Sequence, residues 1–223
     1  MTAARAARLR AALLDPLEAQ RIEVAGSEAA AVLVPLFERD PPSRGAGPPS
    51  RGAGGELHAV FTRRRPDLRI HAGQISFPGG RREPGDADLV ATALREAHEE
   101  IGLDPAAVTV VGALRPTPTV VSDIAIYPIV GLIAAPTAAW LLAAAEVEAV
   151  IEAPLAQLSA THRLETFTRP GGATVTTDAY SIGADTIWGA TARILADLLA
   201  RLGLEPAGAP ERPASDGSPA ARP

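Results

Sequence analysis

The chain contains no cysteine among its 223 residues. Disulfide bonds, thiolate metal sites and a cysteine nucleophile are therefore excluded. Lysine is absent as well, since all 21 basic residues are arginine, and aromatic residues make up only 4 % of the chain. Because 47 % of the residues are hydrophobic, a core can still form, built mainly from Val, Leu, Ile and Ala. The length predicts one domain with extensions at its ends.

An excess of positive charge is also lacking. The net charge of −5 argues against a nucleic-acid partner, because neutralising phosphates needs a basic surface. Residues 124–145 carry no charge and are long enough to span a membrane, but Pro128, Gly131 and Pro136 divide them, which favours buried strands. The arginine-rich N-terminal stretch lacks the apolar segment of a secretory signal. We therefore expect a cytoplasmic protein without a membrane partner.

Composition divides the chain into three parts. Residues 1–24 indicate a helix followed by a link, residues 25–203 the main domain, and residues 204–223 a disordered tail rich in Pro, Ala, Gly and Ser. Inside the domain, residues 41–54 are two copies of the heptad PPSRGAG. This segment has too little apolar surface to join a core, so we predict a disordered loop.

Alternating apolar residues predict a series of strands. Apolar residues at helical spacing predict a helix at the end of the domain. The expected strands are 29–37, 56–62, 108–114, 124–133, 146–153, and a hairpin of 162–168 with 174–180. The final helix is expected at 187–202, capped by Thr186 or Asp185. Residues 140–145 fit either a short helix or a flexible apolar loop that acts as a lid or as a dimer contact.

The most informative stretch is Phe77–Leu103. It starts with a strand end that breaks at Gly79 and Gly80, and continues into a helix expected from about Asp88 to Ile101. Either Asp86 or Asp88 can cap the helix, and Gly102 stands where a glycine commonly ends one. A four-residue spacing marks its buried stripe. The stripe consists of Leu89, Ala93, Ala97 and Ile101.

Three carboxylates share another face of that helix. Glu96, Glu99 and Glu100 stand at positions i, i+3 and i+4, where like charges repel one another. A solvated acidic face is one explanation. The other is a metal site, because hard divalent cations prefer clustered carboxylate oxygens and can clamp a diphosphate while activating water.

These residues resemble the Nudix box, whose pattern is Gly-x5-Glu-x7-Arg-Glu-U-x-Glu-Glu-x-Gly-U with U aliphatic. Arg95 to Leu103 matches its second half, with Ala97 at a U position. The first half departs, because the acid at the x5 interval after Gly80 is Asp86, not a glutamate, and eight residues, not seven, separate it from Arg95. The resemblance implies an α/β/α sandwich with a mixed, partly antiparallel sheet, in agreement with the strand-helix-strand order.

The resemblance also implies roles for individual residues. Glu96, Glu99 and Glu100 would hold Mg²⁺ or Mn²⁺, and Arg95 would orient a carboxylate. Gly79 and Gly80 would let backbone carbonyl groups approach a metal ion. The general base stays open between Glu99 and another acid. The candidates for that acid are Glu146, Glu148 and Asp86.

A second resemblance lies upstream, in a stretch with six arginines and one acid between residues 63 and 82. Arg64, Arg69, Gly73 and Phe77 to Gly80 are spaced as in the signature of coenzyme A pyrophosphatases, a Nudix subfamily; Arg65 departs from it. The resemblance implies that coenzyme A is cleaved to 4′-phosphopantetheine and adenosine 3′,5′-bisphosphate, with acyl-CoA or oxidised CoA as further substrates. It makes Arg64, Arg69 and Gly73 candidates for substrate binding.

Two alternatives stay open. A Nudix enzyme acting on another nucleoside diphosphate, such as ADP-ribose, would keep the glutamates without needing the upstream signature. A non-catalytic nucleotide-sensing module would keep the fold but usually lose acids of the box, and the three helix glutamates are all present. A homodimer is compatible with the sequence.

Overall fold

The computed structural model describes residues 3–40, 55–68, 72–119, 123–168, 172 and 174–205. The helices are α1 (Ala3–Ala12), α2 (Pro16–Ala19), α3 (Leu89–Ile101), η1 (Pro105–Ala107), α4 (Leu155–Ala160) and α5 (Gly189–Arg201). The strands are β1 (Glu28–Arg39), β2 (Glu56–Arg64), β3 (Ile75–Ser76), β4 (Gly79–Arg81), β5 (Thr109–Ala113), β6 (Thr117–Pro118), β7 (Ile124–Leu132), β8 (Val147–Pro154), β9 (Arg163–Thr168), β10 (Thr174–Ile182) and β11 (Asp185–Ile187).

The long strand β1 lies at the centre of a mixed sheet. Along the main path the strand order is β3-β2-β1-β7-β5, while β4 pairs with β1, β6 with β7 and β8 with β2. Strands β1 and β7 are parallel, and the other described pairs are antiparallel. The predicted fold class, with its mixed and partly antiparallel sheet, is therefore confirmed.

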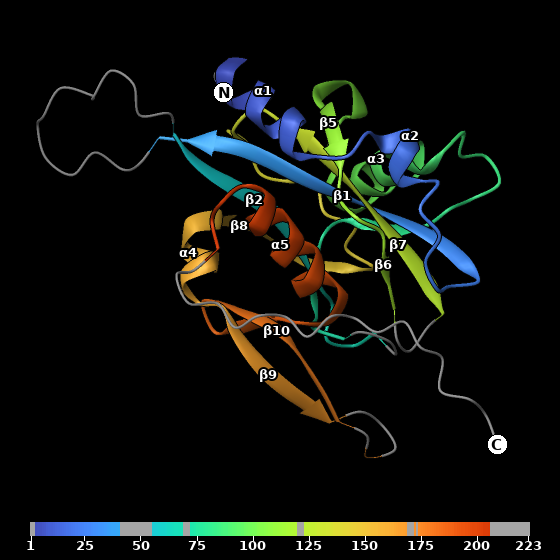
Figure 1. Cartoon of the computed structure of the whole chain (residues 1–223), viewed down its shortest axis with the longest axis vertical. Coiled ribbons are helices and arrows are strands. Elements are labelled where there is room, and N and C mark those ends of the chain that lie inside the picture. Colours follow the sequence, from blue (N-terminus) through green and yellow to red (C-terminus); the bar gives the residue numbers. More distant parts are fainter. Residues whose placement is uncertain are drawn as a thin grey trace, which may run out of the picture.

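Helices cover both faces of this sheet (Figure 1). Side chains alternate between the two faces of a strand, so Leu33 of β1 packs with the stripe of α3, whereas Val34 and Leu36 pack with α5. Leu9 of α1 and Leu155 of α4 belong to the same cluster as α5. The predicted stripe of α3 is confirmed, because all four of its side chains are buried.

A smaller sheet of β9, β10 and β11 extends away from the body of the molecule (Figure 1). Its predicted hairpin is confirmed, with Phe167 opposite Val175. The predicted cap of the last helix is wrong. Asp185 to Ile187 form β11 against β10, and α5 begins only after Trp188. A tight turn at Gly183, which has φ of 60°, pairs Asp185 with Ile182, and Asp185 also forms an ion pair with Arg63 of β2.

Residues 140–145 do not form a helix, so that alternative is wrong. They are held as a loop by contacts distant in sequence: the Trp140 indole donates to Glu152 at 2.9 Å, and the Ala143 amide donates to the Glu100 carbonyl at 2.9 Å. The predictions for residues 41–54 and for the tail beyond residue 205 lie outside the described residues. Within the described part, no helix is long and apolar enough to cross a membrane.

Candidate active site

The turn before α3 requires glycine. Gly79 has φ of 159°, and a Cβ atom there would lie 2.4 Å from the Ala31 carbonyl oxygen of β1. Such an overlap is not tolerated, so only glycine lets β4 pair with β1 at this position. The pairing places Gly79 opposite Val32 and Gly80 opposite Ala31. It brings the glycine turn to the α3 side of the sheet.

The ends of α3 are defined by the residues predicted for them. The Asp88 carboxylate accepts from the Ala91 amide at 2.8 Å, which satisfies one of the free amides of the first turn. Gly102 ends the helix at φ of 69°, with its amide bonded to the helix carbonyls. The helix is thereby fixed in length and in rotation about its axis, with its apolar stripe on the sheet.

Two of the three predicted carboxylates face the glycine turn. A Cβ atom on Gly80 would lie only 2.5 Å from Glu96 Oε1, so the missing side chain makes room for that carboxylate. The Gly79 amide donates to Glu100 Oε2 at 3.3 Å. The Glu100 side chain is 9 % exposed and that of Glu96 17 %. Two acids are therefore held together, largely out of water.

Glu99 does not join them. Its side chain is 56 % exposed, and its carboxylate accepts from Arg95 NH1 at 2.9 Å. In the described ranges no group of three or more His, Asp or Glu side chains is arranged to hold a metal ion. The expected convergence of all three glutamates is thus not found in this arrangement. A role of Glu99 in metal binding stays a prediction.

Arg95 is held by Asp86. Its Nε and NH2 donate to the two Asp86 oxygens at 3.0 and 3.1 Å, and NH2 also lies 3.0 Å from Glu96 Oε1. The hydrogen bonds with Arg95 hold the pKa of Asp86 well below its usual range, and the same bonds raise the pKa of Arg95. The prediction that Arg95 orients a carboxylate agrees with these contacts.

Asp86 is poorly suited as the general base that the sequence left open. Besides Arg95, it accepts from the Thr92 hydroxyl at 2.9 Å and from the Glu83 amide at 2.9 Å. A carboxylate with these donors and a lowered pKa has little tendency to take up a proton. Asp86 does not stand at the spacing before Arg95 that the Nudix box has for its first glutamate, and its contacts indicate a different role, which is to hold Arg95 in place.

Glu146 approaches the acid pair from the start of β8. Arg64, at the end of β2, connects the two: its NH2 lies 3.7 Å from Glu146 Oε2 and its NH1 4.0 Å from Glu100 Oε1. Glu148, the other acid considered, lies instead 4.0 Å from Arg63. No spacing rule relates residues 64, 100 and 146. The pairing of β2 with β8 places Arg64 beside Glu146, and the packing of α3 on the sheet adds Glu100.

The acid pair is electrostatically unfavourable without a counter-charge. Burial raises the pKa of Glu100 to about 7, and the charge of Glu96 adds to the rise. Burial also raises the pKa of Glu96 above its usual value. Two buried carboxylates with hard oxygen donors, beside a glycine turn that leaves space, fit a divalent cation. Arg95, 3.0 Å from Glu96, and Arg64, 4.0 Å from Glu100, offset this charge only in part.

The upstream candidates are only partly described. Arg69 lies outside the described residues. Gly73 has φ of 68°, and its amide donates to the Arg65 carbonyl at 3.4 Å, so it shapes the turn between β2 and β3. Arg65 forms an ion pair with Asp67 at 2.7 Å. Of the run Arg63 to Arg65, Arg64 is therefore the residue directed at the acid pair.

Comparisons with known proteins identify the family of this chain. The family model described as the NUDIX domain matches residues 44–170. The chain therefore belongs to the Nudix family of hydrolases. Proteins named "Uncharacterized Nudix hydrolase NudL" from Salmonella newport (strain SL254) and Salmonella agona (strain SL483) are 37 % identical to it over 187 residues, which cover 82 % of this chain and 88 % of theirs.

Solved structures show more distant likenesses. A MutT/nudix family protein from Enterococcus faecalis has a TM-score of 0.48 and 15 % identity, covering 82 % of this chain and 64 % of that one. The NUDIX domain of Shewanella oneidensis NrtR, complexed with ADP ribose, has a TM-score of 0.40 and 19 % identity, covering 70 % and 85 %. Because both the sequence identity and the TM-score are low, the ligand of that domain says nothing about the substrate of this chain.

Proposed function

We propose that the protein hydrolyses the diphosphate of coenzyme A, giving 4′-phosphopantetheine and adenosine 3′,5′-bisphosphate. Two things support the proposal beyond membership of the hydrolase family. One is the resemblance of the stretch before the glycine turn to the coenzyme A pyrophosphatase signature. The other is the position of Arg64, the signature residue that lies against the acid pair.

The position of Arg64 carries the proposal. Its two ion-pair distances, 3.7 and 4.0 Å, are too long for strong hydrogen bonds, and its buried Nε has no hydrogen-bond partner in the described structure. A guanidinium group is suited to bidentate contacts with phosphate oxygens. An anionic substrate between Arg64 and the acid pair would satisfy these donors.

In this proposal Glu96 and Glu100 hold the divalent cation, Mg²⁺ or Mn²⁺, with Glu99 as a further candidate ligand. The bound cation neutralises diphosphate oxygens and lowers the pKa of water. Arg95, fixed by Asp86, keeps Glu96 in place, and Arg64 binds the substrate diphosphate. Glu146 is the acid outside the helix that is best placed to accept a proton, because Arg64 holds its carboxylate near the pair.

A substrate panel tests the proposal. The protein is incubated with Mn²⁺ or Mg²⁺ and with CoA, acetyl-CoA, oxidised CoA, ADP-ribose, NADH or diadenosine polyphosphates, and products are separated by chromatography. We expect CoA compounds to be cleaved with the highest kcat/KM, releasing adenosine 3′,5′-bisphosphate. Preference for ADP-ribose or another dinucleotide would identify a different Nudix hydrolase, and no turnover with any substrate would indicate a sensing module.

An arginine variant tests the supporting observation. Arg64→Ala should raise KM for CoA strongly, because the substrate loses a charged hydrogen-bonding partner. Arg115→Ala is the matched control, since Arg115 is exposed and has no side-chain contact among the described interactions. Equal KM values for both variants would contradict a substrate contact of Arg64.

The quaternary state is part of the proposal. Leu141 is 76 % exposed and Leu142 37 %, and two neighbouring exposed leucines are suited to a contact between two copies of the chain. Light scattering coupled to size exclusion would show a homodimer that Leu141→Ser weakens. A monomer at all concentrations would rule this contact out.

A further inference from the structure

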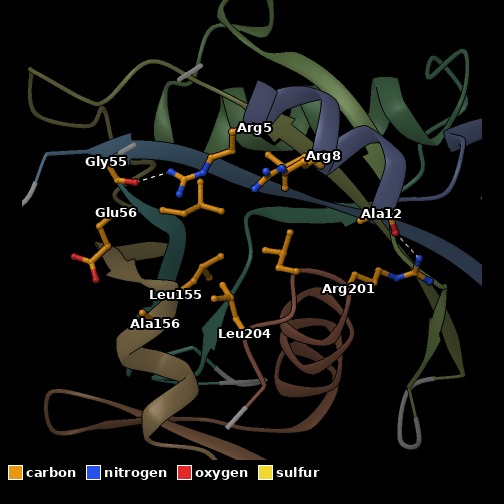
Figure 2. A pocket seen from close by; sticks show the side chains of 12 residues that line it. Arg5, Arg8, Ala12, Gly55, Glu56, Leu155, Ala156, Arg201 and Leu204 are labelled. Atoms are coloured by element: carbon orange, nitrogen blue, oxygen red, sulfur yellow. Dashed lines mark hydrogen bonds between the residues drawn. The ribbon is translucent and has the colours of Figure 1, made fainter. Parts of the chain in front are cut away.

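A cavity lies on the face of the sheet opposite α3. It has a volume of about 700 Å³ and is bounded by α1, the start of β2, α4 and the end of α5 (Figure 2). Its lining leucines, Leu9 and Leu155 among them, belong to or pack against the cluster of α5, whereas α3 packs in the other cluster. The sheet therefore separates this cavity from the acid pair. The volume is in the range of small-molecule sites.

The cavity has an aliphatic wall. Five leucines line it, and none of the described residues around it is aromatic. Leu57, Leu202 and Leu204 are partly exposed to the cavity, whereas Leu9 and Leu155 are buried, at 2 % and 0 % exposed. Without an aromatic ring there is no surface on which a nucleobase would stack. The wall is suited to a flexible alkyl chain, whose transfer from water to such a surface is favourable.

The rim of the cavity carries three arginines. Arg5 donates to the Glu38 carboxylate and to the Gly55 carbonyl, and Arg201 donates to Asp197 at 3.0 Å and to the Ala12 carbonyl at 2.8 Å. These contacts hold the first and the last guanidinium in place. In the view of Figure 2 the guanidinium of Arg8 lies between them.

Arg8 is the arginine of the rim whose charge is not offset by a carboxylate among the described residues. Among the described interactions it has no hydrogen bond and no ion pair, whereas the charges of Arg5 and Arg201 are offset by carboxylates. It stands at i+3 from Arg5 and precedes Leu9 on the stripe of α1 that lines the cavity. The one acid of the lining, Glu56, points away from Arg8 in Figure 2.

From this arrangement we propose that the cavity binds a monoanionic amphiphile, a straight-chain fatty acid of about ten carbons. The carboxylate accepts from the guanidinium of Arg8, with Arg5 and Arg201 on either side. The alkyl chain lies on the leucine wall. An inorganic anion would leave that wall unused, and a cationic amphiphile would be repelled by the arginines. The site is independent of the diphosphate chemistry, because the sheet lies between them.

Calorimetric titration of the full chain with sodium decanoate, below its micelle concentration, tests the proposal. For a ligand of this size we expect a Kd on the order of 0.1 mM. Arg8→Ala should weaken binding about tenfold, and Leu204→Ser should weaken it as well. The matched control is Arg10→Ala, an exposed arginine of the same helix that does not line the cavity, which should bind as the unaltered chain does. Circular dichroism confirms that each variant is folded.

Ligand controls distinguish the head group from the chain. Acetate and decyltrimethylammonium should bind at least tenfold more weakly than decanoate. Equal binding of either one, equal binding by Arg8→Ala, or an equal loss in Arg10→Ala would overturn the proposal. Glu100→Gln should bind decanoate unchanged, and a loss of binding in that variant would place the ligand at the acid pair and refute the cavity as the site.

Discussion

Replacing Glu100 by glutamine should stabilise the metal-free protein at alkaline pH. The Glu100 side chain is 9 % exposed, and its carboxyl has a pKa of about 7 in the folded chain, against 4.5 ordinarily. At a pH between these two pKa values, the folded state therefore keeps a proton that the unfolded chain has released. Stability consequently falls as the pH rises from about 4.5 to 7, by about 3 kcal/mol in total. Glutamine keeps the shape and an acceptor for the Gly79 amide but removes the charge.

The effect is measured by thermal unfolding in EDTA between pH 5 and 8.5. At pH 8.5 Glu100→Gln should melt higher than the unaltered chain by about 6–12 °C, since about 1 kcal/mol corresponds to 2–4 °C in a domain of this size. At pH 5 the two should melt alike. Asp86 does not interfere with this comparison. Its pKa is lowered in the folded state, so its contribution to stability is fully present above its ordinary pKa and is lost only at more acidic pH.

Metal ions complete the test. Mn²⁺ should raise the melting temperature of the unaltered chain, because a ligand of the folded state stabilises it, and should raise that of Glu100→Gln much less. Turnover of Glu100→Gln should fall by orders of magnitude. Glu99→Gln, on the same helix but more than half exposed, serves as the control and should change the EDTA melting temperature little. An unchanged pH dependence in Glu100→Gln would refute the reasoning from burial.

Two further substitutions test the surroundings of the pair. Asp86→Asn should cost about 2 kcal/mol of stability in urea unfolding and lower kcat/KM, because Arg95 loses its charged partner; full activity would show that Arg95 needs no anchor. Gly80→Ala should lower kcat/KM about tenfold or more with little change in melting temperature, because the new Cβ displaces the Glu96 carboxylate. Gly85→Ala, where a Cβ meets nothing within 4 Å, is its control, and an equal effect of both would show that Gly80 is not required for the site.

Local sequence was sufficient for the elements with strong periodicity. The five long strands of the main sheet and the hairpin were predicted close to their observed positions, and α3 begins after Asp88 and ends at Gly102 as expected. The short strands β4 and β6 were not predicted, and β4 lies where the sequence indicated a break at Gly79 and Gly80. Such features depend on residues a few positions apart, so a sequence window contains their causes. The start of α5 was predicted too early, because the turn at Gly183 folds Asp185 to Ile187 back on β10, where Asp185 also contacts Arg63 of another strand.

The amino-acid sequence by itself determined that three glutamates share one side of a helix behind a glycine turn, because the helical repeat places them there. The tertiary structure decided which of them form the buried pair. Pairing of β4 with β1 brings the glycines to Glu96 and Glu100, while Arg95 draws Glu99 outward. It also decided that Asp86 holds Arg95 and that Arg64 lies between Glu100 and Glu146. These contacts join residues whose separation along the chain follows no repeat, and only the packed sheet brings them together.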